Sequence, residues 1–579
     1  MTQRVVIDPL TRIEGHLRIE LETQGNSISK AWSETTQFKG IETVIGGRDP
    51  RDAWAFAQRI CGVCTAVHAI ASAVAVEDAI GSQPPRQARL IRDLILGSQN
   101  IQDHVIHFYH LHAFDWVNVP SAATADPAKA VAFAESIGST WKGNTLQRMT
   151  EVRDTVAGIL KAGQLSVFTG GYWDHPDYRL PPEANLMAVA HYLDALEFQR
   201  SMIRIATVFG GKNPHPNFLV GGMACSIDPK GNGSINQTQL DEVGGWVNEC
   251  VEFVQNCYVP DAMAIMGVYK DYFDIGAAQP NFFAVGLAGA CFAGNPAAST
   301  LTSPYGAVKP GVLLDGDLHT VHDFDPAKVA EWVSSAWMRY DGGDIGLYPA
   351  EGETIVNYTG PRPPYEWLAD SKEYTWCKAP RYDGHVMQVG PVARLLLANA
   401  QGHEVTGKAV EAARTKLGIS LEQFNSTAGR TLARAIDCSV VAQILSESVY
   451  PEFVKNIQAG DTNVFDATRW EPSSWPKHCA GFSFLEVPRG NLSHWVGIDD
   501  EKVSRYQAVV PTTWLAGGRD ATGTPGPYEE SLGGTGMHPL ANPDEPLEPL
   551  RTIHSFDPCM SCGVHVLDPA GTELNVVTS

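Results

Sequence analysis

Two Cys-x-x-Cys pairs near opposite ends of the chain constrain its fold more than any other feature of the sequence. The first is Cys61-Gly-Val-Cys64, and the second, Cys559-Met-Ser-Cys562, stands shortly before the C-terminus. A zinc ribbon usually separates its two pairs by about 15–20 residues, whereas most of this chain lies between them. A large fold must therefore bring two remote elements together, which favours a buried cofactor over a small zinc finger.

The chemistry of four thiolates leaves several cofactors open. Soft sulfur ligands suit zinc, an iron–sulfur cluster or a thiophilic transition metal such as nickel, and two independent redox or structural pairs are the alternative. Covalent c-type haem is excluded, because Thr65 and Gly563 rather than histidines follow the two pairs. The remaining cysteines show no ligand spacing and are expected to be buried, inert thiols: Cys225, Cys250, Cys257, Cys291, Cys377, Cys438 and Cys479.

Composition limits the class of protein and its partners. The chain has 579 residues, 44% apolar and 19% charged, which predicts a globular protein over most of its length. A net charge of −22 disfavours a nucleic-acid partner and an anionic membrane surface. The most apolar run, Phe282 to Gly294, is shorter than the roughly 20 residues that a spanning helix needs, and the N-terminus lacks the pattern of a signal peptide.

Hydrophobic periodicity predicts an α+β fold, a single large helix-dominated unit with a central helical core and peripheral short sheets. Helical spacing recurs at 52–79, 86–116, 150–164, 184–209, 387–418 and 421–458, and short strands are expected at 481–485 and 506–510. We therefore divide the chain into a strand-rich part at 3–50, a helical core at 51–265, an irregular lobe at 266–385, a second helical part at 386–458 and a C-terminal part at 459–565.

Three motifs carry a resemblance to a known family. They are Arg12-Ile-Glu-Gly-His16, Arg59-Ile-Cys-Gly-Val-Cys64 and Asp557-Pro-Cys-Met-Ser-Cys562-Gly-Val-His565. Together they resemble the large, catalytic subunit of nickel–iron hydrogenases of the respiratory uptake type, and the resemblance covers essentially the whole chain. It implies an oxidoreductase that splits dihydrogen heterolytically and oxidises it to two protons and two electrons, with 459–565 as the metal-binding part.

The resemblance implies a ligand set for two metals. Cys61, Cys64, Cys559 and Cys562 would all bind nickel, and Cys64 and Cys562 would also bridge to an iron that carries carbon monoxide and cyanide. Cys61 and Cys559 would then be terminal. A terminal thiolate, for which we name Cys559, would accept the proton, since a metal-bound thiolate serves as a base without a separate buried carboxylate. Glu14 would then relay that proton outward.

Further residues would surround the metals. Arg489 is similar to the guanidinium held over their open face, where it organises charge rather than acting as a base, and Asp103 and Asp557 resemble the carboxylates that pair with it. Pro488, Arg489 and Thr512 would line the iron side, where donors bond the cyanide nitrogens.

A histidine and a second metal site complete the implied set. His68 resembles a residue that hydrogen-bonds a bridging sulfur and tunes the cluster. Glu42, the carbonyl of Ala508 and His565 match positions that bind magnesium together with water, as hard oxygen ligands allow. The run of His104, His107, His110 and His112 is instead expected to form hydrogen bonds in the core or at an interface.

The resemblance also bears on maturation, partners and location. Residues 566–579 follow His565, where the family's large subunit commonly ends after an endopeptidase removes such an extension, so the chain resembles the precursor. The implied partners are an iron–sulfur small subunit, a membrane cytochrome b or another quinone-linked anchor, the maturation endopeptidase and nickel-insertion proteins, with no nucleic acid. The expected location is the periplasmic side of the membrane, by co-export with the small subunit; the cytoplasm is the alternative.

Three other functions stay open at this point. A hydrogen-sensing signalling subunit would have the same metal site and little turnover, although sensor chains usually lack the C-terminal extension. A quinone-reductase-like scaffold would share the fold but lack these cysteines. A structural zinc protein would contain zinc and no nickel.

Overall fold

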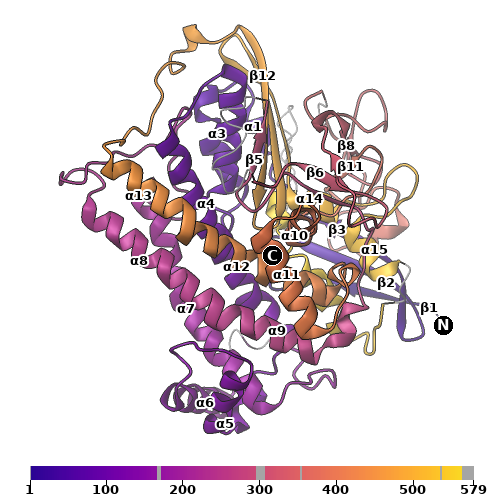
Figure 1. Cartoon of the computed structure of the whole chain (residues 1–579). Helices are drawn as coiled ribbons and strands as arrows, with labels where there is room; N and C mark the ends of the chain where they lie inside the picture. Colours follow the sequence, from indigo (N-terminus) through magenta and orange to yellow (C-terminus); the bar gives the residue numbers. More distant parts are fainter. Residues whose placement is uncertain are drawn as a thin grey trace.

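Long helices form one side of the molecule and short sheets the other (Figure 1). The computed structural model describes residues 2–165, 168, 171–294, 307–351, 355–534 and 538–563, so His565 and the extension at 566–579 lie outside the described part. The helices are α1 Ile41–Ile45, α2 Ala53–Ala57, α3 Val67–Ile80, α4 Arg86–Ile106, α5 Pro127–Ser136, α6 Leu146–Lys161, α7 Pro182–Gly210, α8 Gln237–Phe253, α9 Val259–Val268, α10 Pro391–Ala400, α11 Glu404–Leu417, α12 Thr427–Ile444, α13 Tyr450–Gln458, α14 Pro511–Ala516, α15 Pro527–Gly533, α16 Leu547–Ser555 and α17 Met560–Gly563.

The helical core is built around α4. Its apolar residues recur at helical spacing, and Leu90, Leu94, Ile101 and Val105 are all fully buried. α4 packs against α7 and α12, and α12 packs in turn against α9 and α10. α4, α8 and α12 each continue into a π-helical turn, at His107–His112, Val254–Tyr258 and Leu445–Val449. The predicted α+β class, dominated by helices, is confirmed.

The strands form small antiparallel sheets. The N-terminal sheet has the order β1-β2-β3, and a second has the order β14-β13-β12-β5. The strands are β1 Thr2–Ile7, β2 Leu17–Gln24, β3 Ser27–Thr35, β4 Phe282–Ala284, β5 Cys291–Ala293, β6 Gly311–Leu313, β7 His322–Asp323, β8 Val329–Trp332, β9 Met338–Arg339, β10 Ile355–Val356, β11 Ala379–Tyr382, β12 His478–Val487, β13 Gly490–Asp499 and β14 Lys502–Val509.

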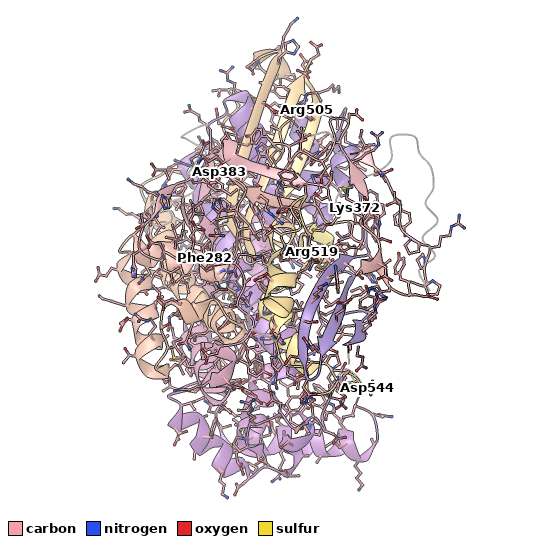
Figure 2. The ribbon with its side chains drawn as sticks, turned by 90° about the vertical axis from the view of Figure 1, so that its right-hand side faces the viewer. Phe282, Lys372, Asp383, Arg505, Arg519 and Asp544 are labelled. Carbon is pink, nitrogen blue, oxygen red and sulfur yellow. The ribbon has the colours of Figure 1, made fainter. Side chains whose placement is uncertain are left out.

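The N- and C-terminal parts of the chain meet at the first sheet. α15 packs on β3, so a yellow C-terminal helix lies beside the indigo strands in Figure 1. Figure 2 faces this side and labels Arg519, which donates to the carbonyl of Ala31 in β3 at 3.2 Å. The N-terminal strands predicted from alternation are confirmed.

The second sheet is longer than the sequence predicts. In place of short strands at 481–485 and 506–510, the hairpin of β12 and β13 pairs from His478↔Asp499 to Val487↔Gly490. Gly481 allows this sheet to lie on α3, because a Cβ there would stand 2.4 Å from the carbonyl oxygen of Ala75. The hairpin turn at its inner end carries Pro488 and Arg489 into the core.

No helix within the described ranges is long and apolar enough to cross a membrane. The core has two large parts, one mostly of helices and one lined by the short sheets. Cys61, Cys64, Cys559 and Cys562 all belong to the first part, whereas Met560, between the last two, belongs to the second. The cysteines therefore sit where the two parts meet.

Candidate metal centre

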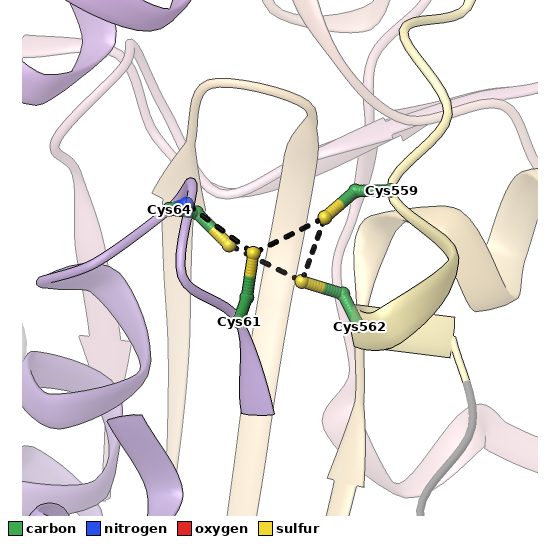
Figure 3. A group of neighbouring side chains, drawn as sticks. All are labelled: Cys61, Cys64, Cys559 and Cys562. Atoms are coloured by element: carbon green, nitrogen blue, oxygen red, sulfur yellow. Dashed lines mark hydrogen bonds between the residues drawn. The ribbon is translucent and has the colours of Figure 1, made fainter. Parts of the chain in front are cut away.

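The structure brings the four sulfur atoms of the two remote pairs into one buried cluster (Figure 3). The Sγ atoms of Cys61 and Cys559 are 3.3 Å apart, those of Cys64 and Cys562 3.2 Å, and those of Cys559 and Cys562 3.1 Å. All four lie within 4.8 Å of one another, and none forms a disulfide.

Each pair is presented by a tight turn. Cys61 and Cys64 lie in the turn that leads into α3, where the N–H of Cys64 donates to the Sγ of Cys61 at 3.3 Å. Cys559 precedes α17 and Cys562 lies within it, and the N–H of Cys559 donates to the Thr512 hydroxyl at 3.2 Å. A Cys-x-x-Cys turn aims both sulfurs to one side, so two facing turns produce a four-sulfur cluster.

The N-terminal loop holds the C-terminal turn in place. Glu14 and Cys559 form a parallel β-bridge, and the N–H of Met560 donates to the Glu14 carbonyl at 2.8 Å. Gly15, the residue after Glu14, has a φ of +83°, and a Cβ there would stand 2.9 Å from both Met560 Cβ and the Ser561 nitrogen. Only glycine fits this close approach without strain.

The surroundings shift the pKa values of the cluster's thiols in different directions. Burial disfavours the thiolate of Cys61, but hydrogen bonds from the other three thiols outweigh it and lower the pKa of Cys61 well below its usual value. Burial raises the pKa of Cys64 to about 11. Hydrogen bonding to Cys562, together with burial, raises the pKa of Cys559. A soft cation is the partner that would let four adjacent buried sulfurs ionise together, so the donor set fits thiophilic metals.

Glu14 lies beside Cys559, whose sulfur is the proton acceptor implied by the family resemblance. The Sγ of Cys559 is 3.4 Å from Glu14 Oε2, and the N–H of Ser561 donates to the same oxygen at 2.8 Å. The side chain of Glu14 is half-buried, so it connects the sulfur cluster with less enclosed surroundings.

Arg489 is buried and paired with both carboxylates named from the sequence. Its guanidinium lies 3.0 Å from Asp103 Oδ2 and 3.1 Å from Asp557 Oδ1. Burial opposes the charge of Arg489, but Asp557, Cys559 and Asp103 raise its pKa further above the usual value. Burial also raises the pKa of Asp103 to about 7, against the nearby arginine charge, while Gln99 donates to its other oxygen at 2.8 Å.

Pro488, Thr512 and His68 are buried around the cluster. The Nε2 atom of His68 is 3.4 Å from the Sγ of Cys562, and its Nδ1 is 3.2 Å from Nε2 of His494. Burial lowers the pKa of His68 to about 4, so the ring is neutral at pH 7. His494 is not predicted from the sequence, because an isolated histidine in a strand carries no motif.

Glu42 is buried at the start of α1, and the predicted magnesium site is only partly described. The Ala508 amide, rather than the carbonyl expected as a ligand, contacts Glu42 Oε1 at 2.7 Å. Burial raises the pKa of Glu42 to about 8, opposed by the nearby charge of Lys378. His565 lies outside the described residues, and no sequence signal points to Lys378.

The other histidines and cysteines have structural surroundings. His104, His107, His110 and His112 form hydrogen bonds in the interior, as predicted, to Asp437, the His554 carbonyl, the Tyr192 carbonyl and Asp115. The prediction of buried thiols holds for Cys250, Cys257, Cys291, Cys377 and Cys438 but is wrong for Cys225 and Cys479, which are partly exposed. Cys479 lies near the outer end of β12, where it packs, only partly buried, against a small third cluster of core residues.

Known proteins and family models match this chain over nearly its whole length. A family model described as nickel-dependent hydrogenase matches residues 39–565, and one described as HoxL-like matches residues 4–38. The chain is 43% identical to the uptake hydrogenase large subunit of Rhizobium leguminosarum bv. viciae, over 99% of this chain and 96% of that protein. It is 42% identical to the hydrogenase-1 large chain of Escherichia coli strain K12, with the same coverage of both proteins.

A solved structure agrees with the fold. The chain resembles the Ni-Fe-Se hydrogenase of D. vulgaris Hildenborough with a TM-score of 0.74 and 30% sequence identity. The similarity covers 98% of this chain and 100% of that one.

Proposed function

The chain belongs to the nickel-dependent hydrogenase family as the large subunit of an uptake-type nickel–iron enzyme, and we propose how its residues divide the work of splitting dihydrogen. The convergence of four buried sulfurs within 4.8 Å carries the proposal. Hydrogen sensing is not favoured, because the relatives are named as uptake hydrogenases and hydrogenase-1 large chains.

Cysteine thiolates hold the nickel and iron of this family, and in this chain all four sulfurs would hold nickel, while Cys64 and Cys562 would also hold iron. Pro488 and Thr512 would line the iron side, where carbon monoxide and cyanide are the proposed iron ligands. When bound, the two metals supply the Lewis-acidic, redox-active centre at which the H–H bond is polarised. The protein supplies a soft, water-poor ligand set and the groups that move the proton.

The proton leaves through Cys559 and Glu14. The Cys559 sulfur takes up the proton and passes it across 3.4 Å to Glu14 Oε2. The N–H of Ser561 holds that oxygen in place at 2.8 Å, which keeps the carboxylate aimed at the sulfur. Short, oriented transfer between positioned groups is what general acid–base catalysis requires.

Arg489 organises charge above the sulfurs rather than moving a proton. It stays protonated, and its two carboxylate partners keep a buried cation compensated. A fixed positive charge beside the thiolates stabilises negative charge that accumulates there, without reorganisation during the reaction. His68 would act on the sulfur of Cys562 through its hydrogen bond at 3.4 Å.

A magnesium ion at Glu42, the Ala508 carbonyl and His565, completed by water, is part of the same proposal. The buried carboxyl group of Glu42 supports it as a hard oxygen ligand of the kind that magnesium prefers. Metal analysis of Glu42→Gln protein would show nickel retained and magnesium lost.

As a large subunit, the chain works with a small subunit. Among the residues that the structure describes there is no second cluster of four cysteines, so electrons would pass to iron–sulfur clusters of that partner. We further propose a membrane cytochrome b or another quinone-linked anchor, a periplasmic location at the membrane, nickel-insertion proteins, and an endopeptidase that removes 566–579. The active enzyme should then lack these residues in mass spectra, and full activity of the uncut chain would contradict that step.

Metal analysis with infrared spectroscopy tests the assignment of the cluster. The purified enzyme should contain nickel and iron and show bands of metal-bound carbon monoxide and cyanide, all lost together in Cys64→Ser protein. Zinc in place of nickel, without such bands, would overturn the proposal.

Glu14→Gln tests the proton route. The amide keeps the shape and the hydrogen bond to Ser561 but cannot carry a proton, so nickel content should be unchanged while turnover falls about 10²- to 10⁴-fold. Isotope exchange between dihydrogen and solvent should fall equally. Glu14→Asp keeps a carboxyl group on a side chain shorter by one methylene and should retain intermediate activity. Undiminished turnover in Glu14→Gln would show that Glu14 is not part of the proton route.

A further inference from the structure

Arg394 lies in α10 and is fully buried, with a relative exposure of 0%. It donates to the carbonyl oxygens of Val487 at 2.8 Å and Pro488 at 3.2 Å. Its remaining contacts are to Asp437 at 2.7 and 3.1 Å and to Glu486 at 3.2 Å. One planar guanidinium thus connects two backbone carbonyls with two carboxylates.

The two carbonyls that Arg394 binds belong to the residues immediately before Arg489. They define the two peptide planes that lead into that residue, so they set the direction in which its side chain leaves the backbone. β12 ends at Val487 and pairs again only at Gly490, and Pro488 has no N–H to donate. Side-chain donors must therefore fix this turn in place of a sheet ladder.

The start of α10 lies against the same turn. Gly390, the residue before α10, has a φ of +110°, and a Cβ there would stand 2.8 Å from the carbonyl oxygen of Arg489. A Cβ on Gly490 would stand 2.7 Å from the Gly390 nitrogen. The turn that carries Arg489 is thus in contact with α10 through both backbone and side chain.

Asp437 links this support to the groups that hold the Arg489 guanidinium. Asp437 accepts from Nε2 of His104 at 2.9 Å. Asp103, the residue before His104, binds Arg489 directly at 3.0 Å. Two consecutive residues of α4 therefore hold Arg489. Asp103 binds the Arg489 guanidinium directly, and His104 supports the Arg489 backbone through Asp437 and Arg394.

We propose that Arg394 is a positioning residue for the reaction, which fixes the backbone before Arg489 and so aims the Arg489 guanidinium over the sulfur cluster. The inference rests on the proposed role of Arg489. Lysine cannot replace arginine here, because a single ammonium cannot reach two carbonyls and two carboxylates with the fixed fork that a guanidinium offers.

A double-mutant cycle on the complete enzyme, large and small subunits together, tests this inference. Arg394→Lys should retain nickel but lower the turnover number about 10- to 100-fold, as expected for a misaimed catalytic group. Arg489→Lys should lower it at least as much. If Arg394 acts through Arg489, adding Arg394→Lys to Arg489→Lys should lower turnover less than about threefold further, because residues that act as one unit are not additive.

Infrared spectra give a readout apart from activity. Bands of the metal-bound carbon monoxide should shift in the same direction in Arg394→Lys and Arg489→Lys, and the double variant should resemble Arg489→Lys. Arg92→Lys is the matched control, since Arg92 is an equally buried arginine that binds Glu77 and the carbonyls of Leu219 and Gly222. Arg92→Lys should leave the infrared bands in place. In the double variant with Arg489→Lys, the fold losses of turnover of the two single variants should multiply, as expected for independent residues.

The outcomes separate the two hypotheses. If Arg489→Lys is fully active, the proposed role of Arg489 fails and that of Arg394 with it. If Arg489→Lys is impaired but the losses multiply in the double variant, or the bands of Arg394→Lys do not move, only the inference on Arg394 is overturned. If Arg394→Lys fails to load nickel, Asp437→Asn replaces it in the same cycle under the same criteria.

Discussion

Glu34 is a buried carboxyl group that lowers stability at neutral pH, so Glu34→Gln should stabilise the protein. Glu34 lies in β3 with 0% exposure, where its Oε2 accepts from Arg18 at 2.9 Å. Arg18 is shared with Glu20 and Asp8, so one cation serves three carboxyl groups. Burial, with repulsion from Glu20, raises the pKa of Glu34 to about 10 from 4.5.

The magnitude follows from proton linkage. Folded Glu34 keeps its proton at pH 7, while the unfolded chain ionises above pH 4.5, and each pH unit between the two values costs about 1.4 kcal/mol of stability. The cost is absent below pH 4.5, reaches about 3 kcal/mol at pH 7 and grows until pH 10. Glutamine is neutral in both states and keeps an acceptor for Arg18, so Glu34→Gln should recover this free energy.

Differential scanning calorimetry of the complete enzyme across pH measures the effect. With an unfolding entropy of about 2.1 cal/mol/K per residue over this chain length, 3 kcal/mol corresponds to roughly 2–3 °C in Tm. The Tm gain of Glu34→Gln should be near zero at pH 4.5, about 2–3 °C at pH 7 and larger at pH 8. Glu77→Gln is the control in which Tm should fall, because Glu77 accepts from Arg92 at 2.6 and 2.8 Å and the substitution leaves the buried charge of Arg92 without this carboxylate. A gain that does not change with pH, or a loss like that of the control, would refute the linkage argument.

Three further predictions concern the metal centre and its supports. Gly15→Ala should cost about 2–4 kcal/mol and reduce nickel loading, whereas Gly138→Ala, at a φ of +86° in open space, should cost only about 1 kcal/mol; equal thermal shifts for the two would show that contact with the C-terminal turn is unimportant. Cys61→Ser should bind less than about a tenth of the nickel, measured by elemental analysis, because a hydroxyl is a poor ligand for a soft metal. His68→Phe should lower nickel affinity or turnover about 10- to 100-fold, as loss of a hydrogen bond to a ligand does, and unchanged values for both would leave His68 as a core residue.

Local patterns were sufficient to predict the elements whose apolar residues recur at a regular spacing. The apolar residues of α4 recur at helical spacing although most of its polar residues are buried as well. β13 was missed because both of its faces are covered, and Asn491, Ser493 and His494 are as buried as its apolar residues. A strand buried on both sides shows no alternation to detect.

For the site, motifs identified residues but not their partners. The cysteine pairs and Arg489 stand in recognisable local patterns, whereas their meeting depends on contacts across the whole chain. Arg394, His494 and Lys378 are single residues in ordinary helix, strand and loop sequence. Nothing local distinguishes them from other polar residues, since their significance lies in which remote backbone or side chain they reach.

The way the C-terminal turn is held links folding to metal binding. Besides the sulfur cluster, Cys559 is tied by the Glu14 bridge and the Thr512 hydroxyl, and Ser561 is tied by Glu14 and Gln37. These are a few hydrogen bonds without a sheet or a long helix, each worth only about 1 kcal/mol net. Four buried thiols that compete for protons add little until a metal replaces those protons, so metal binding supplies much of the free energy that closes the turn. The same closure sets Glu14 against Cys559, which means that the proton route forms only when the metal ligands are in place.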